Sequence, residues 1–151
     1  MKILIDADGC PVVDIAVRLG REAGVDCVII CDTSHSIEKD GATTITVPKG
    51  NDSVDFKLVN MAQKGDIVIT QDYALAAMCL ARQAIPISQD GFVYDSSNID
   101  SLLMQRHTAK KVRMSGGRIK GPAKRTQGQN KAFEEQLRKL LAGSCNCDRA
   151  V

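Results

Sequence analysis

The sequence predicts an α/β protein with three layers, α/β/α. A five-stranded, mostly parallel sheet is expected between helices on both faces, with further helices at the C-terminus. Five short apolar runs alternate with helix-like segments over the first 90 residues. These runs are continuously apolar, which is typical of parallel strands buried on both faces. A chain of 151 residues with 44% apolar and 25% charged residues is long enough for one domain with a core of its own.

Three strands and one helix are expected in the first third of the chain. Pro11 suits the first turn of a helix, where its missing N–H is not needed, and Gly24 suits the helix end. Pro48 then ends a β-branched strand. The expected elements are strands at residues 2–5, 25–31 and 43–47 and a helix over residues 11–23.

The remaining elements alternate in the same way up to residue 87, and the pattern then changes. A helix over residues 52–63, a strand at 67–69, a helix at 73–82 and a strand at 84–87 are expected. A short helix from residue 99 and a basic segment at 106–125 follow. A last helix from about residue 131 carries an apolar stripe that should dock on the sheet, formed by Phe133, Leu137, Leu140 and Leu141. We predict one domain over residues 1–143 and a disordered tail over 144–151.

Charge is distributed unevenly along the chain. Residues 1–100 hold 8 Lys and Arg against 15 Asp and Glu, a net charge of −7, whereas residues 101–151 hold 12 against 3, a net charge of +9. A basic C-terminal third indicates a polyanionic partner such as nucleic acid, or a tail that packs against the acidic body. Aromatic residues make up 3% of the chain, so binding is expected to be mainly electrostatic.

Cysteine usage and hydropathy favour a cytoplasmic protein. The six cysteines follow no secretory signal and are expected to be reduced thiols. Cys145 and Cys147 form a C-x-C pair without the further ligands that a zinc site needs. The sequence contains no apolar stretch of bilayer length, so no membrane partner is expected. A homo-oligomer stays open.

Acidic residues from three separate segments are expected at one edge of the sheet. Asp6 and Asp8 follow the first strand, and Asp72 follows the fourth, which should be its neighbour at the point where the strand order reverses. Asp52 and Asp55 begin a helix and share a face. Clustered carboxylates repel one another unless a cation neutralises them, and their oxygens suit Mg²⁺ or Mn²⁺. Asp8 and Asp52 have an alternative role as helix caps.

Four motifs in order make the chain resemble a known family. They are Asp6-Ala-Asp-Gly-Cys-Pro-Val12, Val47-Pro-Lys-Gly-Asn-Asp-Ser-Val-Asp55, Gly65-Asp-Ile-Val-Ile-Thr-Gln-Asp72 and Gly121-Pro122. Together they resemble the YaiI/YqxD family of bacterial proteins, which is grouped by fold with PIN-like nuclease domains. The resemblance runs from residue 1 to about residue 143. Gln129-Asn130 departs from it, because an acidic residue is expected there.

The resemblance implies metal-dependent hydrolysis of a phosphodiester, with RNA rather than DNA as the expected substrate. Asp6, Asp8, Asp55 and Asp72 would be the catalytic residues and ligands of Mg²⁺ or Mn²⁺, with two ions ~4 Å apart. Asp52, Thr70 and the loop residue His35 would lie around these ligands, without being among the four metal ligands themselves. The expected contacts to nucleic acid are Lys49, Arg106, Lys110, Lys111, Arg113, Arg118 and Lys120.

Two other functions fit the same residues. A haloacid-dehalogenase-like phosphatase would use Asp6 as a covalent nucleophile and Asp8 as its acid and base. Against it, Gly9-Cys10 replaces the usual continuation of that motif, and no clear catalytic lysine is found. The other alternative is a non-catalytic RNA-binding module with the same fold.

Overall fold

A computed structural model describes residues 1–34, 37–50, 52–116 and 124–147, apart from the side chains of Ala109, Arg113 and residues 144–147. Five strands form one sheet in the order β3-β2-β1-β4-β5, and every pair of neighbouring strands is parallel. The predicted sheet is therefore confirmed, with β1 and β4 side by side. The strands are β1 (Lys2–Asp6), β2 (Asp26–Asp32), β3 (Ala42–Val47), β4 (Ile67–Ile69) and β5 (Ile85–Ile87).

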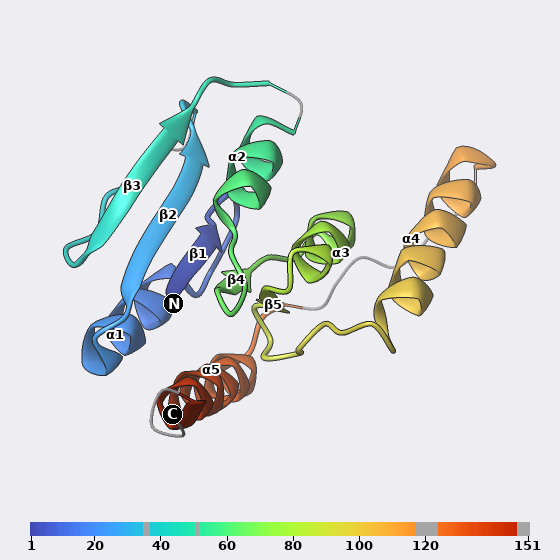
Figure 1. Cartoon of the computed structure of the whole chain (residues 1–151). Coiled ribbons are helices and arrows are strands. Elements are labelled where there is room, and N and C mark those ends of the chain that lie inside the picture. The colour runs from blue at the N-terminus through green and yellow to red at the C-terminus, as the bar shows by residue number, and fades with distance from the viewer. Residues whose placement is uncertain (35–36, 51, 117–123, 148–151) are drawn as a thin grey trace.

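Helices cover both faces of the sheet, as predicted (Figure 1). On one face lie α1 (Val13–Ala23) and α5 (Gln127–Cys147), and on the other lie α2 (Ser53–Met61) and α3 (Tyr73–Ala81). Further out, α4 (Ile99–Met114) packs on α3. The result is a three-layer α/β/α arrangement with one added helix.

Two apolar cores, one on each face, hold the layers together. Along β1, Ile3 and Ile5 point into the core shared with α1 and α5, whereas Leu4 points into the core under α2 and α3. All three side chains are fully buried. Because successive side chains of a strand point to opposite faces, a strand must be apolar throughout to supply both cores.

The apolar stripe of α5 docks on the sheet as predicted, but the helix is longer than predicted at both ends. Phe133 and Leu137 are fully buried in the core beneath it. The helix begins at Gln127 because Thr126 and Gln129 form a capping box: the Gln129 Oε1 accepts from the Thr126 N–H, and the Thr126 Oγ1 accepts from the Gln129 N–H.

The helical backbone of α5 also continues to Cys147, four residues beyond the predicted end of the domain at residue 143. No proline interrupts residues 144–147, so the hydrogen-bonded turns can continue. Residues 148–151 lie outside the described chain, as do the side chains of Cys145 and Cys147.

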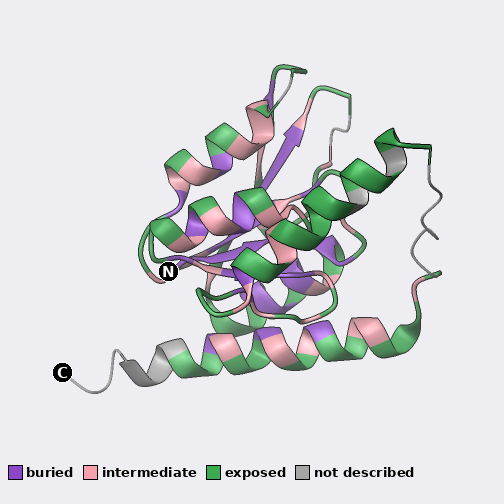
Figure 2. Cartoon of the chain, turned by 90° about the vertical axis from the view of Figure 1, so that its right-hand side faces the viewer, coloured by how far each residue is buried: buried purple, intermediate pink, exposed green. Residues whose placement is uncertain are grey.

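The basic segment is also more helical than predicted, because α4 runs through its first half. Residues 104–114 are mostly good helix formers such as Lys, Arg, Gln and Met, and the first glycine comes at 116. Only the first turns of α4 are anchored, where Ile99, Leu102 and Leu103 pack against α3 and Tyr94. Every described side chain of residues 104–114 is exposed (Figure 2).

Asp66, directly before β4, is a buried acid with a structural role. Its side chain is buried, and it accepts hydrogen bonds from the backbone N–H groups of Lys2 and Gln63 and forms a 2.6 Å ion pair with the Lys2 ammonium. Asp66 therefore joins the start of β1 to the turn before β4, at the edge of the sheet opposite the clustered acids.

The four described cysteines are free thiols, and Cys27, Cys31 and Cys79 are buried. Gly20 of α1 explains how closely that helix approaches β2, because an added Cβ would collide with the Cys27 sulfur. None of the helices in the described ranges is long and apolar enough to span a bilayer.

Candidate functional site

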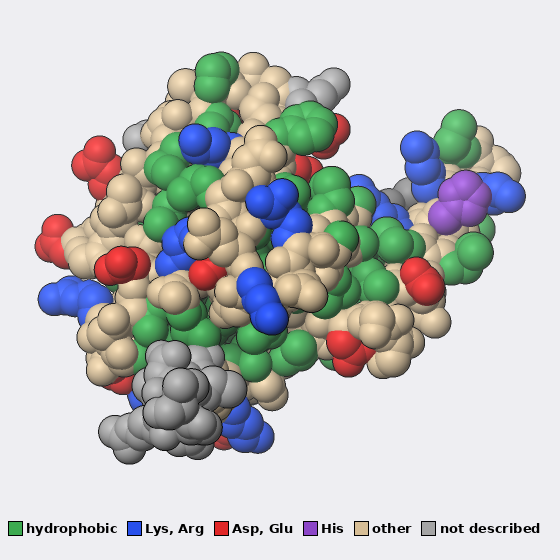
Figure 3. Space-filling model, viewed as in Figure 1, with side chains coloured by type: hydrophobic (Ala, Val, Ile, Leu, Met, Phe, Trp, Pro, Cys, Tyr) green, Lys and Arg blue, Asp and Glu red, His purple; other side chains and the backbone are tan. Residues whose placement is uncertain are grey.

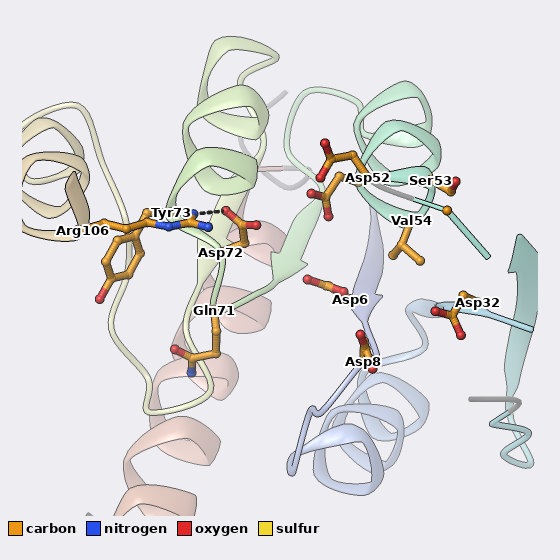
Figure 4. Close-up of a pocket in the computed structure, with 12 residues that line it drawn as sticks. Asp6, Asp8, Asp32, Asp52, Ser53, Val54, Gln71, Asp72, Tyr73 and Arg106 are labelled. Carbon is orange, nitrogen blue, oxygen red and sulfur yellow. Dashed lines mark hydrogen bonds and ion pairs between the residues drawn. The ribbon is translucent and has the colours of Figure 1, made fainter. Parts of the chain in front are cut away.

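A cavity of about 430 Å³ opens at the carboxyl ends of the strands, where ligands of parallel α/β proteins bind (Figure 4). All five aspartates predicted for this edge line it, and a sixth, Asp32, joins them. The other lining residues come from the loop between β3 and α2, from α2, from the β4–α3 turn and the start of α3, and from α4. The lining consists of Asp6, Asp8, Asp32, Gly50, Asp52, Ser53, Val54, Asp55, Gln71, Asp72, Tyr73 and Arg106.

Asp6 lies at the centre of the acidic group and is held by Thr70. As the last residue of β1 it is partly buried, and its Oδ2 accepts a hydrogen bond of 3.0 Å from the Thr70 hydroxyl. The same Thr70 oxygen accepts from the backbone N–H of Asp72, also at 3.0 Å. One buried hydroxyl thus fixes the Asp6 side chain relative to the β4–α3 turn.

The carboxylates perturb one another. Burial, together with the negative charges of Asp55, Asp72 and Asp8, raises the pKa of Asp6 to about 6, against the lowering effect of the hydrogen bond from Thr70. The pKa of Asp55 is raised by burial and by Asp72 and Asp52, against the positive charge of Arg106. An added cation would relieve this repulsion.

Neither alternative capping role applies. The N-cap residue of α1 is Val12. Asp8 therefore lies outside the helix, and Pro11 precedes the first turn instead of occupying it. Asp52 does hold the N-cap position of α2 but makes no capping hydrogen bond with its side chain. Its backbone has a φ of 62°, in the left-handed region. That conformation costs a non-glycine residue roughly 1 kcal/mol, and Asp52 keeps it while lining the cavity.

In the part of the chain that the structure describes, all polar contacts of the Asp72 carboxylate are made by one of its two oxygens. The Asp72 Oδ1 caps α3 by accepting from the N–H groups of Ala74 and Leu75, and it forms a 2.9 Å ion pair with the Arg106 guanidinium of α4 (Figure 4). Within the described residues, no hydrogen bond reaches the other oxygen, Oδ2. Among the described residues that line the cavity, Arg106 is the only cation.

Asp32 is a lining residue that our prediction missed. It ends β2, which pairs with β1 in parallel, so its carboxyl end lies at the same sheet edge as Asp6. Its Oδ1 accepts from the Ser34 N–H. The rule that pointed to Asp6 and Asp72, an acid directly after an apolar strand, also points to Asp32.

The residues predicted to bind nucleic acid fall into three groups: one lies at the cavity, others are exposed away from it, and the rest lie outside the described chain. Arg106 reaches the cavity, Lys110 and Lys111 are exposed further along α4, and Lys49 is exposed beside the lining residue Gly50. Figure 3 shows α4 projecting from the body with basic side chains on its surface. His35, Arg118, Lys120 and the side chain of Arg113 lie outside the described residues.

Arg125, at the end of the basic segment, is already engaged. Its guanidinium pairs with Asp90 at 2.6 Å and donates to the Gln89 carbonyl and the Asn130 side chain. Arg125 therefore has a structural role at the start of α5.

The chemical type of the side chains that line this cavity suits a hard divalent cation, because carboxylate oxygens are the ligands that Mg²⁺ and Mn²⁺ prefer. Their positions, however, do not form a ready-made metal site. Within the described chain, no three Asp, Glu, His or Cys side chains are arranged to hold one ion. Asp72 is paired with Arg106 instead.

Comparison with known proteins assigns the chain to a family. The family model described as "Uncharacterized BCR, YaiI/YqxD family" matches residues 4–143. The chain belongs to the YaiI/YqxD family. The match covers the sheet apart from the first two residues of β1, together with every described residue of the acidic cavity. The resemblance seen in the motifs is therefore confirmed.

Relatives in the YaiI/YqxD family match along nearly their full length. A UPF0178 protein of Exiguobacterium sibiricum is 52% identical over 141 residues, which are 93% of this chain and 96% of the relative. UPF0178 proteins of Ruminiclostridium cellulolyticum and Clostridium acetobutylicum are 47% and 43% identical, covering 91% and 93% of this chain and 90% and 97% of the relatives. No solved structure matches the chain.

Proposed function

We propose that this YaiI/YqxD protein is a metal-dependent phosphodiesterase of the PIN-like nuclease kind, with RNA as its substrate. The observation that carries the proposal is the convergence of aspartates from β1, the β4–α3 turn and α2 on one cavity at the carboxyl edge of the sheet. Such an edge binds ligands in parallel α/β proteins, and a concentration of carboxylates there is costly without a cation.

Asp6, Asp8, Asp55 and Asp72 would hold Mg²⁺ or Mn²⁺, with Asp52 and Asp32 in outer positions. When bound, the ions supply a water of lowered pKa and stabilise charge on the phosphate oxygens. The protein's own part is positional. Thr70 orients Asp6 through its hydroxyl, and the capping bonds of Asp72 fix that side chain at the start of α3.

The basic side chains of α4 would bind the phosphate backbone of the substrate next to the acidic cavity. Arg106 stands at the cavity itself, and Lys110 and Lys111 follow along the exposed part of the helix. Contacts of this type attract any polyanion, so we expect weak sequence preference and a strong decrease in affinity with rising salt.

The test is cleavage of a single-stranded RNA by the purified protein with Mn²⁺ or Mg²⁺, compared with DNA of the same sequence. We expect cleavage of the RNA, and its loss in Asp6→Asn and Asp55→Asn with the circular dichroism spectrum unchanged. Asp26→Asn is the matched control, because Asp26 is exposed at the amino end of β2, away from the cavity. Activity that persists in both cavity variants would refute the proposal.

Two further measurements on the same protein separate the alternatives. A phosphorylated Asp6 trapped during turnover of a phosphomonoester would indicate a phosphatase, whereas metal-independent RNA binding without cleavage would indicate a non-catalytic module. Against the phosphatase, no lysine is found among the described residues that line the cavity, and the Asp6 Oδ2 already accepts from Thr70.

A further inference from the structure

The position of Arg106 differs from that of the other basic residues on α4. Lys110 and Lys111 extend into solvent, whereas Arg106 points back to the body and pairs with Asp72 at 2.9 Å inside the acidic cavity (Figure 4). Its positive charge also opposes the rise in the pKa of Asp55, a carboxylate on a different helix, which burial and the neighbouring aspartates cause. One guanidinium therefore neutralises part of a site that we propose for a cation.

The ion pair is of a kind that can exchange partners. The Arg106 side chain is 57% exposed and that of Asp72 is 30% exposed, so the contact is open to solvent. Exposed pairs of this type contribute at most ~1 kcal/mol. In addition, the first turns of α4 pack on α3 and Tyr94, whereas every described side chain of residues 104–114 is exposed.

We infer that Arg106 exchanges Asp72 for a substrate phosphate, so that binding of RNA and binding of the divalent cation assist each other. The inference rests on the proposed function and specifies how its site is regulated. Without RNA, Arg106 competes with the cation for Asp72. With RNA bound, its planar guanidinium pairs with a phosphate, for which its geometry is well suited, and the Asp72 carboxylate is released to the cation.

Asp72 can take part in this exchange without losing its place. Its capping bonds to Ala74 and Leu75 are independent of Arg106, and they hold the carboxylate at the start of α3. Departure of the guanidinium therefore changes the charge at the cavity and leaves the backbone in position. The coupling is reciprocal: whatever RNA adds to the affinity for the cation, the cation adds to the affinity for RNA.

The test compares Arg106→Ala with Lys110→Ala, which removes the same charge one helical turn further along α4, outside the cavity. Mn²⁺ affinity is measured without RNA by electron paramagnetic resonance, and affinity for a single-stranded RNA is measured with and without Mn²⁺. Without RNA, we expect Arg106→Ala to bind Mn²⁺ about 5-fold more tightly than the wild type, because an exposed ion pair no longer competes. We expect Lys110→Ala to bind Mn²⁺ as the wild type does.

The two variants should also separate in RNA binding. Both should bind RNA more weakly, but only Arg106→Ala should lose the increase in RNA affinity that Mn²⁺ gives the wild type. Equal Mn²⁺ affinity in the wild type and Arg106→Ala would overturn the inference alone. Absence of Mn²⁺ binding in both would overturn the proposed function together with it. Tight Mn²⁺ binding with the expected coupling but no cleavage would leave the inference standing and refute the nuclease activity.

Discussion

Replacing Asp6 by asparagine should stabilise the metal-free protein at high pH and have little effect at low pH. Asp6 is partly buried among Asp8, Asp55 and Asp72, which together with burial raise its pKa from 3.8 to about 6. Between these two values the folded protein holds a proton that the unfolded chain has released. This carboxyl group therefore stabilises the fold less as the pH rises through that window.

The magnitude follows from the two pKa values. Their separation corresponds to about 3 kcal/mol when the group is fully ionised in both states. About 0.5 kcal/mol of this is already present at pH 4, where the unfolded chain is half ionised, so about 2.5 kcal/mol remains between pH 4 and pH 8. Asparagine has nearly the same shape, can accept from Thr70 and carries no charge.

Urea unfolding in the presence of EDTA measures the effect. The quantity of interest is the difference in free energy of unfolding between Asp6→Asn and the wild type, taken at pH 8 and again at pH 4. We expect this difference to be about 2.5 kcal/mol more favourable to the variant at pH 8. Any cost of the amide that does not depend on pH cancels. Asp26→Asn, at the opposite sheet edge, is the control. A change below ~1 kcal/mol, or of opposite sign, would refute the account of Asp6 as a destabilising buried charge.

Two more substitutions test the contacts around the site and the sheet. Thr70→Val keeps the shape of the side chain but removes the hydroxyl that donates to Asp6, so the pKa of Asp6 should rise above about 6, by roughly one unit. Carboxyl ¹³C NMR titration measures this, and an unchanged or lower pKa would contradict it. Asp66→Ala leaves the Lys2 ammonium and the N–H groups of Lys2 and Gln63 without their buried partner. It should lower the free energy of unfolding by ~3 kcal/mol and the melting temperature by roughly 10 °C, and an unchanged melting curve would contradict the role of Asp66.

The cost of keeping an ionised Asp6 in the fold supports the proposed function. A residue whose ionised form weakens the fold at neutral pH is kept at the centre of a cavity that contains five other aspartates. Asp52, at a φ of 62°, adds backbone strain at the rim of the same cavity. Strain and unfavourable charge concentrated in one place are typical of sites that bind a ligand.

The sheet and its cores could be predicted from the sequence because each element has a local signal. Continuous apolar runs such as the one before Asp6 must be buried on both faces, and the order in which helices separate them restricts the strand order to few arrangements. Where the prediction failed, a local signal was overlooked. The capping pair Thr126 and Gln129 moves the start of α5, and the acid that ends β2, Asp32, belongs to the same edge as Asp6.

By itself, the sequence determined the strands, most of the helices and the fact that acids follow the ends of neighbouring strands, since apolar periodicity and parallel pairing are sufficient for these. Only the tertiary structure decided what each acid contacts. That Thr70 holds Asp6, that Asp52 does not cap its helix and that Arg106 pairs with Asp72 depend on how separate elements pack. Hydrogen bonds and ion pairs between residues 34 or 64 positions apart leave no periodic pattern in the sequence, because their geometry is set by the packing of the elements that carry them.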